Sequence, residues 1–162
     1  MVKALDHRVK LVTVKKQEAQ ALTASLLATA ASLVDNIHAG VTARGFDDLR
    51  PTHGFAFTLL SHGGTTVREL ATHLGVTKQA ASQLVDELVS KGYVERTQHP
   101  DDARARLIVL SDKGWACTRA ADQAAADVIR AWTKTLGEQR IRALAGDLAS
   151  IAPSGPLRPA VW

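Results

Sequence analysis

The feature that most constrains the fold is a tight turn between two short helical patterns. Ala71 and Gly75 lie four residues apart at this turn. A glycine at position 75 permits a left-handed backbone, and an alanine at position 71 lets two helices approach closely. Apolar residues at helical spacing occupy the segment 67–74 before the turn. The pattern therefore predicts one helix that ends at Gly75, a sharp turn, and a second helix that ends at Gly92.

Local signals indicate where these two helices begin. Thr66 and Glu69 have the spacing of a capping box, and Thr77 is a good N-cap for the second helix. On that second helix, one face is apolar and packs against the first helix: Ala80, Ala81, Leu84, Val85 and Leu88. The opposite face is polar near its start: Lys78, Gln79, Ser82 and Gln83.

Two strand patterns follow, at residues 93–97 and 104–110, and the loop between them is unusually charged. It reads QHPDDARARLIVL from Gln98 to Leu110, with two aspartates and two arginines close together. Three interpretations are open at this point: a solvated turn, an acid/base site, or a loop that holds an arginine against an anion. The order of helix, turn, helix and charged hairpin is that of a winged helix-turn-helix.

Helical patterns flank this core on both sides. The first covers Lys15 to Ala39, with an apolar stripe and a stop expected at Gly40, and a second begins at Pro51 and ends near Ser61. Another begins at Ser111, reaches about Leu136, and is interrupted at Gly137 before a final helix that ends near Ile151. The expected fold is mainly α with a small β-hairpin wing: a winged helix-turn-helix core flanked by N- and C-terminal helices. We expect a basic tail (1–14), an N-terminal helix and loop (15–50), a winged helix-turn-helix domain (51–114), C-terminal helices (115–152) and a flexible tail (153–162).

Net charge by itself is weak evidence for a nucleic-acid partner. The chain carries +4, but residues 1–16 hold five basic and one acidic residue, whereas residues 65–114 hold seven of each. The arrangement is more informative, because glutamine, serine and lysine on one helix face are suited to the major groove. A polar helix face alone is usually only solvated. In this context we interpret Thr77 and Lys78 as phosphate contacts, Gln79, Ser82 and Gln83 as base contacts, and Arg96 as a further phosphate candidate.

The segment from Thr65 to Gly114 resembles the winged-helix core of the MarR family of bacterial transcriptional regulators. The matching features are E-L-A in the first helix, L-G-V-T at the turn, L-V-x-x-L-x-x-x-G-Y-V-x-R into the hairpin, and D-x-R followed by L-S-x-x-G. The resemblance implies that Asp102 positions Arg104 in the wing and that Arg104 and Arg106 contact the minor groove or phosphate. It also implies a homodimer on double-stranded, inverted-repeat DNA. In that dimer, residues 51–114 would be the DNA-binding domain, and the helices within 15–50 and 115–152 would be the N- and C-terminal dimerisation helices.

Many members of this family are repressors released by small aromatic or phenolic molecules. That resemblance makes His53, Phe55, Phe57 and Trp115 candidates for effector binding, although each has a simpler interpretation as a core residue. Other members sense oxidants through cysteine. Cys117, the one cysteine of the chain, is the corresponding candidate here and lies near the start of a helix.

Other classes of function are poorly supported. Asp101 and Asp102 form an acidic pair, but it lies beside two arginines, with no nucleophile elbow or Gly-rich phosphate loop. The six histidines are scattered without His-x-x-x-His spacing, so we expect no enzyme activity, no metal and no cofactor. We expect a cytoplasmic protein without a membrane segment. The alternative function is a winged-helix protein-interaction or architectural module that does not bind DNA sequence-specifically.

Overall fold

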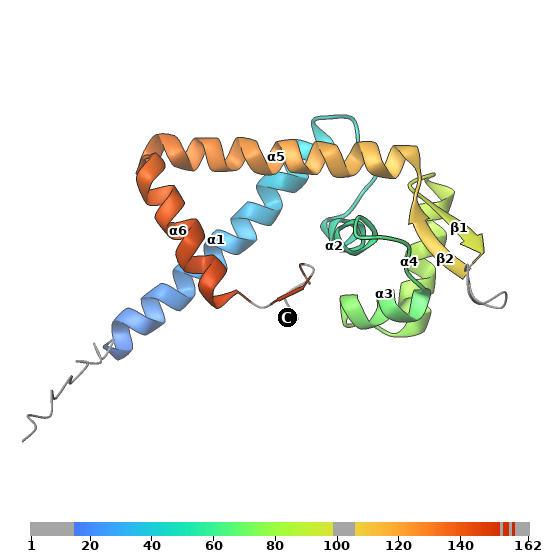
Figure 1. Ribbon diagram of the computed structural model, residues 1–162, viewed down its shortest axis with the longest axis horizontal. Helices are drawn as coiled ribbons and strands as arrows, with labels where there is room; N and C mark the ends of the chain where they lie inside the picture. Colours follow the sequence, from blue (N-terminus) through green and yellow to red (C-terminus); the bar gives the residue numbers. More distant parts are fainter. Residues whose placement is uncertain (1–14, 99–105, 153, 156, 158–162) are drawn as a thin grey trace, which may run out of the picture. The chain divides into compact units, whose positions relative to one another are not determined.

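The computed structural model describes residues 15–98, 106–152, 154, 155 and 157. The elements follow the order α1 (Lys16–Thr42), α2 (Pro51–Leu60), α3 (Val67–Leu74), α4 (Lys78–Ser90), β1 (Val94–Gln98), β2 (Arg106–Leu110), α5 (Asp112–Leu136) and α6 (Glu138–Ile151) (Figure 1). The fold is therefore mainly helical with one antiparallel hairpin, as predicted. The basic tail at 1–14 and most of the tail at 153–162 lie outside the described residues.

The chain divides into two compact units, residues 1–32 and 33–162. In the first unit the described part, residues 15–32, is a helical segment whose side chains are all exposed. Leu22 keeps 58% of its surface exposed and Leu26 keeps 44%. This segment has no hydrophobic core of its own.

The prediction that Gly40 ends the first helix is wrong. Helix α1 continues through Gly40 to Thr42. The glycine instead lies where this helix approaches α5, since a Cβ atom at position 40 would be 2.6 Å from the Cβ of Ala124. The same contact is fastened by Arg44, whose Nη2 donates to Oδ2 of Asp127 at 2.5 Å. The absence of a side chain at Gly40 therefore allows α1 and α5 to pack closely and does not end the helix.

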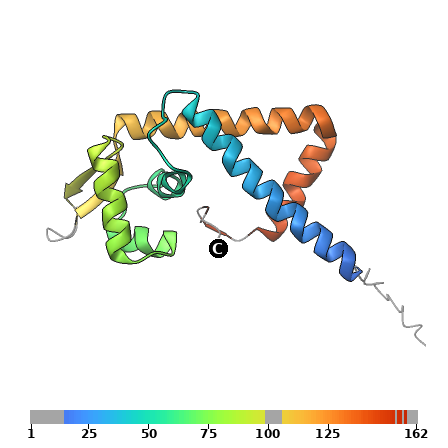
Figure 2. The same cartoon turned by 180° about the vertical axis from the view of Figure 1, so that it is seen from behind.

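The helix-turn-helix has the predicted bounds except at the end of α4, which stops at Ser90, two residues before Gly92. Oγ1 of Thr66 accepts from the Glu69 amide at 3.3 Å while Glu69 accepts from the Thr66 amide at 2.8 Å, which completes the capping box. Gly75 adopts φ 67°, in the left-handed region, and ends α3. Thr77 then caps α4 through its Oγ1, which accepts from the Ala80 amide at 3.1 Å. Figure 2 shows α3 and α4 side by side from behind.

The hairpin pairs Val94 with Leu110 and Gln98 with Arg106. β1 is shifted by one residue from its predicted bounds, and β2 ends at Leu110 as predicted, with its described part beginning at Arg106. The sequence pattern did not reveal that Thr65 adds a bridge to the hairpin. The Thr65 amide donates to the Ile108 carbonyl at 3.0 Å, and the Ile108 amide donates back at 2.8 Å. This bridge attaches the start of the helix-turn-helix to the wing.

The core of the second unit is centred on Tyr93, which is fully buried. Its ring packs 5.7 Å from that of Phe57 on α2, and its hydroxyl donates to Oδ1 of Asp48 at 2.6 Å. The ammonium of Lys113 lies 4.0 Å from the centre of the same ring. A tyrosine at this position gains about 2 kcal/mol or more from burial. It joins the loop before α2, the base of the wing and the start of α5.

Helix α5 begins as predicted, with Oγ of Ser111 accepting from the Gly114 amide at 3.1 Å. Gly137 adopts φ 84° and separates α5 from α6. No residue of α6 is buried. Apolar side chains on α6 remain partly exposed, including Leu144 at 37% and Leu148 at 40%.

Candidate nucleic-acid interface and the adjoining cavity

Helix α4 presents its polar face to solvent. Lys78, Gln79 and Gln83 are exposed and Ser82 is half-buried, while Ala81, Val85 and Leu88 are fully buried on the opposite face. The expectation that Ala80 belongs to the buried face is wrong, because this residue is exposed. The buried positions follow 81, 85 and 88, which places residue 80 on the flank. The residues predicted to contact DNA thus share one accessible surface at the start of the helix.

The acidic residues of α4 lie near its other end and are paired with cations. Nη2 of Arg96, on β1, donates to Oδ1 of Asp86 at 2.6 Å. Glu87 binds the side chains of Arg50 and Lys91. These ion pairs offset the two negative charges. The start of α4 therefore carries an exposed lysine and two glutamines, and no carboxylate of α4 is left unpaired near them. This distribution removes the objection that residues 65–114 are neutral in total.

The wing is only partly described. Arg106 is exposed at the start of β2, opposite Gln98. Arg96 is exposed too, and its ion pair with Asp86 connects the wing to α4. The proposed pair Asp102 and Arg104, and the acidic neighbour Asp101, lie outside the described residues. Their roles stay predictions.

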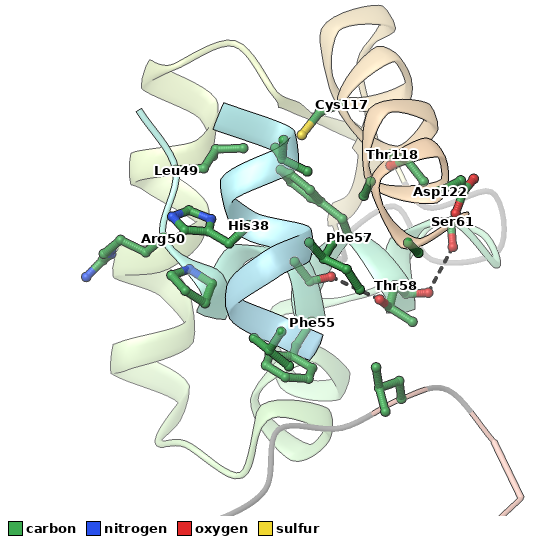
Figure 3. Close-up of a pocket in the computed structure, with 18 residues that line it drawn as sticks. His38, Leu49, Arg50, Phe55, Phe57, Thr58, Ser61, Cys117, Thr118 and Asp122 are labelled. Atoms are coloured by element: carbon green, nitrogen blue, oxygen red, sulfur yellow. Dashed lines mark hydrogen bonds between the residues drawn. The ribbon is translucent and has the colours of Figure 1, made fainter. Parts of the chain in front are cut away.

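A cavity of about 290 Å³ lies among α1, α2 and α5 (Figure 3). Its walls are mainly apolar, with Val34, Ile37, Val41, Phe55, Phe57, Cys117, Ala121 and Ala125. Polar groups are fewer and include His38, Thr58, Ser61, Thr118 and Asp122. An apolar space with few polar groups is suited to a small, largely hydrophobic molecule.

The structure brings together only half of the predicted effector residues. Phe55 and Phe57 line the cavity, whereas His53 and Trp115 do not. His53 is completely buried beside α4, and Trp115 is 41% exposed on α5. The walls supplied by α1 and by the middle of α5 were missed, because their residues look like ordinary helix-packing positions in the sequence.

Cys117 lines the cavity but is 2% exposed. Burial raises the pKa of its thiol to about 11, and the negative charge of Asp48 acts in the same direction. At neutral pH the sulfur is therefore a thiol and not the reactive thiolate. Its position near the start of α5 does not lower the pKa of the thiol enough to offset the effect of burial.

Other kinds of site find little support within the described residues. No three His, Cys, Asp or Glu side chains there are grouped as metal ligands would be. None of the described helices has the length and apolar character that crossing a membrane requires.

Comparison with known proteins agrees with this geometry. Residues 48–105 match the model of the MarR family. CouR, a transcriptional repressor solved bound to a 23-mer DNA duplex, is 26% identical, with 85% of this chain and 96% of that chain covered and a TM-score of 0.65. FabT of Streptococcus pneumoniae, solved in complex with DNA, is 19% identical over 82% of this chain and 94% of its own, with a TM-score of 0.66.

A MarR-family transcriptional regulator from Rhodococcus sp. RHA1 is 20% identical over 82% of this chain and 93% of that chain, with a TM-score of 0.62. No curated protein matches the sequence. The predicted resemblance is confirmed as far as residue 105, which includes the helix-turn-helix and β1. Residues 48–105 thus resemble the MarR family, within a winged-helix fold that the chain shares with solved MarR-family transcription regulators.

Proposed function

We propose that the protein is a ligand-responsive repressor that binds a pseudo-palindromic operator as a homodimer. The observation that carries this proposal is the exposed polar face of α4, with Lys78, Gln79 and Gln83 at the capped start of the helix. Glutamine can bond adenine with two hydrogen bonds in the major groove, and a lysine at the helix start can bind phosphate. Ser82, half-buried, and Thr77 complete the proposed contact surface.

The wing supplies the second part of the proposed interface. Arg106 and Arg96 are exposed on the hairpin, and Arg104 stands two positions before Arg106 in the sequence. Guanidinium groups bind well in the narrow minor groove of A·T-rich DNA. Asp102 would hold Arg104 ready for this contact and so reduce the entropy lost on binding.

Homodimer formation is supported by the apolar surface that the chain leaves uncovered. Leu26 on α1 and Leu148 on α6 keep 44% and 40% of their surfaces exposed. A two-fold dimer presents two recognition helices to successive major grooves, which explains the expected inverted repeat. Access to chromosomal DNA implies a cytoplasmic location.

A small aromatic or phenolic effector is suited to the cavity among α1, α2 and α5. Phe55 and Phe57 supply flat apolar walls, and His38 and Thr58 supply polar groups near them. Binding there would favour a state with lower DNA affinity if the effector prefers that state. Similarity to CouR, a transcriptional repressor, supports the repressor part of the proposal.

The test is selection of genomic fragments followed by titration of the selected duplex at physiological salt. Wild type should enrich a pseudo-palindrome, and Arg104→Ala should bind it more weakly with the fold intact. Lys78→Ala should reduce the slope of log affinity against log salt by about one. Gln123→Ala on α5 serves as a control, because its exposed side chain lies outside the proposed interface. Absence of any enriched sequence would contradict the proposal and favour the interaction or architectural module.

A further inference from the structure

Glu87 is the centre of a charged cluster that joins α4 to the segment before α2 and to α2 itself. Oε1 accepts from Nζ of Lys91 at 2.7 Å, and Oε2 accepts from the guanidinium of Arg50. Lys91 also donates to the main-chain carbonyl of Asp48. Glu87 therefore connects the second half of α4 to residues almost forty positions earlier in the chain.

His53 adds a buried member to this cluster. Its Nδ1 accepts from the Arg50 amide at 3.0 Å, so the neutral ring carries its proton on Nε2. Nε2 lies 3.6 Å from Oε2 of Glu87 and 3.3 Å from Nη2 of Arg50, and of these two only the carboxylate can accept a proton. The ring is fully buried and forms part of the N-terminal turn of α2. The carboxylate thus faces groups from three segments of the chain.

Glu87 is ionised in this cluster. The hydrogen bond from Lys91 lowers the pKa of Glu87, against a smaller opposing effect of burial, and the charges around it lower the pKa further. The Arg50 side chain points away from the cavity, toward α4, although the residue lines the cavity wall (Figure 3). The Arg50–Glu87 ion pair therefore connects the cavity wall directly to the helix proposed to read DNA.

We propose that Glu87 and Arg50 are positioning residues, which hold α4 at the orientation in which Gln79 and Gln83 meet the bases. Neither residue needs to touch DNA for this role. The inference rests on the proposed function, since it concerns how α4 is presented to the operator. It assigns a role in DNA recognition to two residues that lie outside the proposed contact surface of α4.

Electrostatics and positioning make opposite predictions for Glu87→Gln. Removing a negative charge from a DNA-binding domain should strengthen binding to every duplex through the phosphates. Loss of a positioning contact should weaken binding to the selected operator while leaving binding to a scrambled duplex unchanged or slightly stronger. The ratio of the two affinities is therefore the informative quantity. A residue with a merely structural role would not change this ratio in a protein that stays folded.

The experiment measures the affinity of the full chain for the selected operator and for a scrambled duplex of the same length, by fluorescence anisotropy. Glu87→Gln and Arg50→Met should each lower the operator-to-scrambled ratio about tenfold. The double variant should lower it no further, because the two side chains act through one ion pair. Arg50→Lys, which keeps the positive charge, should retain most of the ratio. Glu95→Gln is the matched control: Glu95 is exposed on β1 and forms no ion pair among the described residues.

Thermal melting of each variant verifies that it is folded. If Glu87→Gln does not fold, Arg50→Met decides the question, since the Arg50 side chain is 63% exposed and its loss removes little packing. An unchanged or higher ratio in the folded variants would overturn the inference while the proposed function stands. A wild-type protein that does not discriminate between the duplexes would instead overturn the proposed function, and the inference with it.

Discussion

His53 shows how a single buried side chain makes stability depend on pH. Burial lowers the pKa of His53 below its ordinary value of 6.5, and the cations Arg50 and Lys91 add to this, whereas Glu87 acts against it. The unfolded chain therefore takes up a proton near pH 6.5 that the folded chain resists. By linkage, the stability contributed by the neutral ring is lost as the pH falls through 6.5 and changes no further below the folded-state pKa.

We expect the free energy of unfolding to decrease between about pH 7.5 and pH 5.5, by at most about 1.4 kcal/mol per pH unit for this group. His53→Gln should show a shallower dependence, because it cannot take up the proton. Urea titrations at a series of pH values measure both. Titration of Glu87 does not interfere, since its pKa lies below the ordinary 4.5 and its contribution is lost only under more acidic conditions. Equal pH slopes in the two proteins would contradict this account of His53.

The thiol of Cys117 is predicted to react only slowly with alkylating agents and oxidants at neutral pH. With a pKa raised to about 11 by burial, its thiolate is scarce, and the residue is 2% exposed. Iodoacetamide should therefore modify the folded protein much more slowly than the urea-unfolded protein, as followed by mass spectrometry. Peroxide should leave DNA affinity unchanged, and Cys117→Ser supplies the reference. Rapid alkylation of the folded chain would be inconsistent with the buried position.

At the scale of elements, Gly114 determines how closely α5 approaches the base of the wing. A Cβ atom at this position would overlap the carbonyl oxygen of Tyr93 and crowd the side chain of Leu110. The same carbonyl accepts from the Ser111 amide at 3.0 Å, so it cannot move without disturbing the start of α5. The first turn of α5 is thereby kept in contact with Tyr93, the residue that precedes β1.

Gly114→Ala should destabilise the protein by about 1–3 kcal/mol, because the overlap involves main-chain atoms. Gly146→Ala is the matched control: it lies inside α6 with open space around its Cα, and alanine there should stabilise by about 0.5–1 kcal/mol through helix propensity. Chemical unfolding of the two variants should give changes of opposite sign. A neutral Gly114→Ala would show that α5 can shift away from the wing at little cost.

At the scale of the whole molecule, the expected dimer follows from apolar surface that a single chain does not bury. Light scattering at micromolar concentration should give twice the chain mass of 17.3 kDa. Leu148→Asp places a charge on an exposed apolar position of α6 and should shift the protein toward the monomer. Gln139→Asp adds a charge at an exposed polar position of the same helix and should leave the mass unchanged. A wild-type monomer under these conditions would contradict the homodimer.

How much of the fold could be predicted depends on the range of the interactions that form it. The capping box of Thr66 and Glu69, the N-cap at Thr77 and the left-handed Gly75 connect residues at most four positions apart, so the printed sequence already contains both partners. The bounds of α3 and the starts of α4 and α5 were predicted for this reason. Gly40 was misinterpreted because a glycine that ends a helix and a glycine that admits a neighbouring helix look alike in sequence.

The sequence by itself thus determined the helix-turn-helix, the hairpin and the polar face of α4, because helix periodicity, caps and turn residues act locally. Only the tertiary structure decided which charges meet. The pairing of Glu87 with Arg50, the burial of His53 and the hydrogen bond from Tyr93 to Asp48 join residues more than thirty positions apart. The same holds for the cavity, whose walls come from three helices. Such contacts depend on how whole elements pack, and packing is set by the sum of many side-chain volumes that no short stretch of sequence contains.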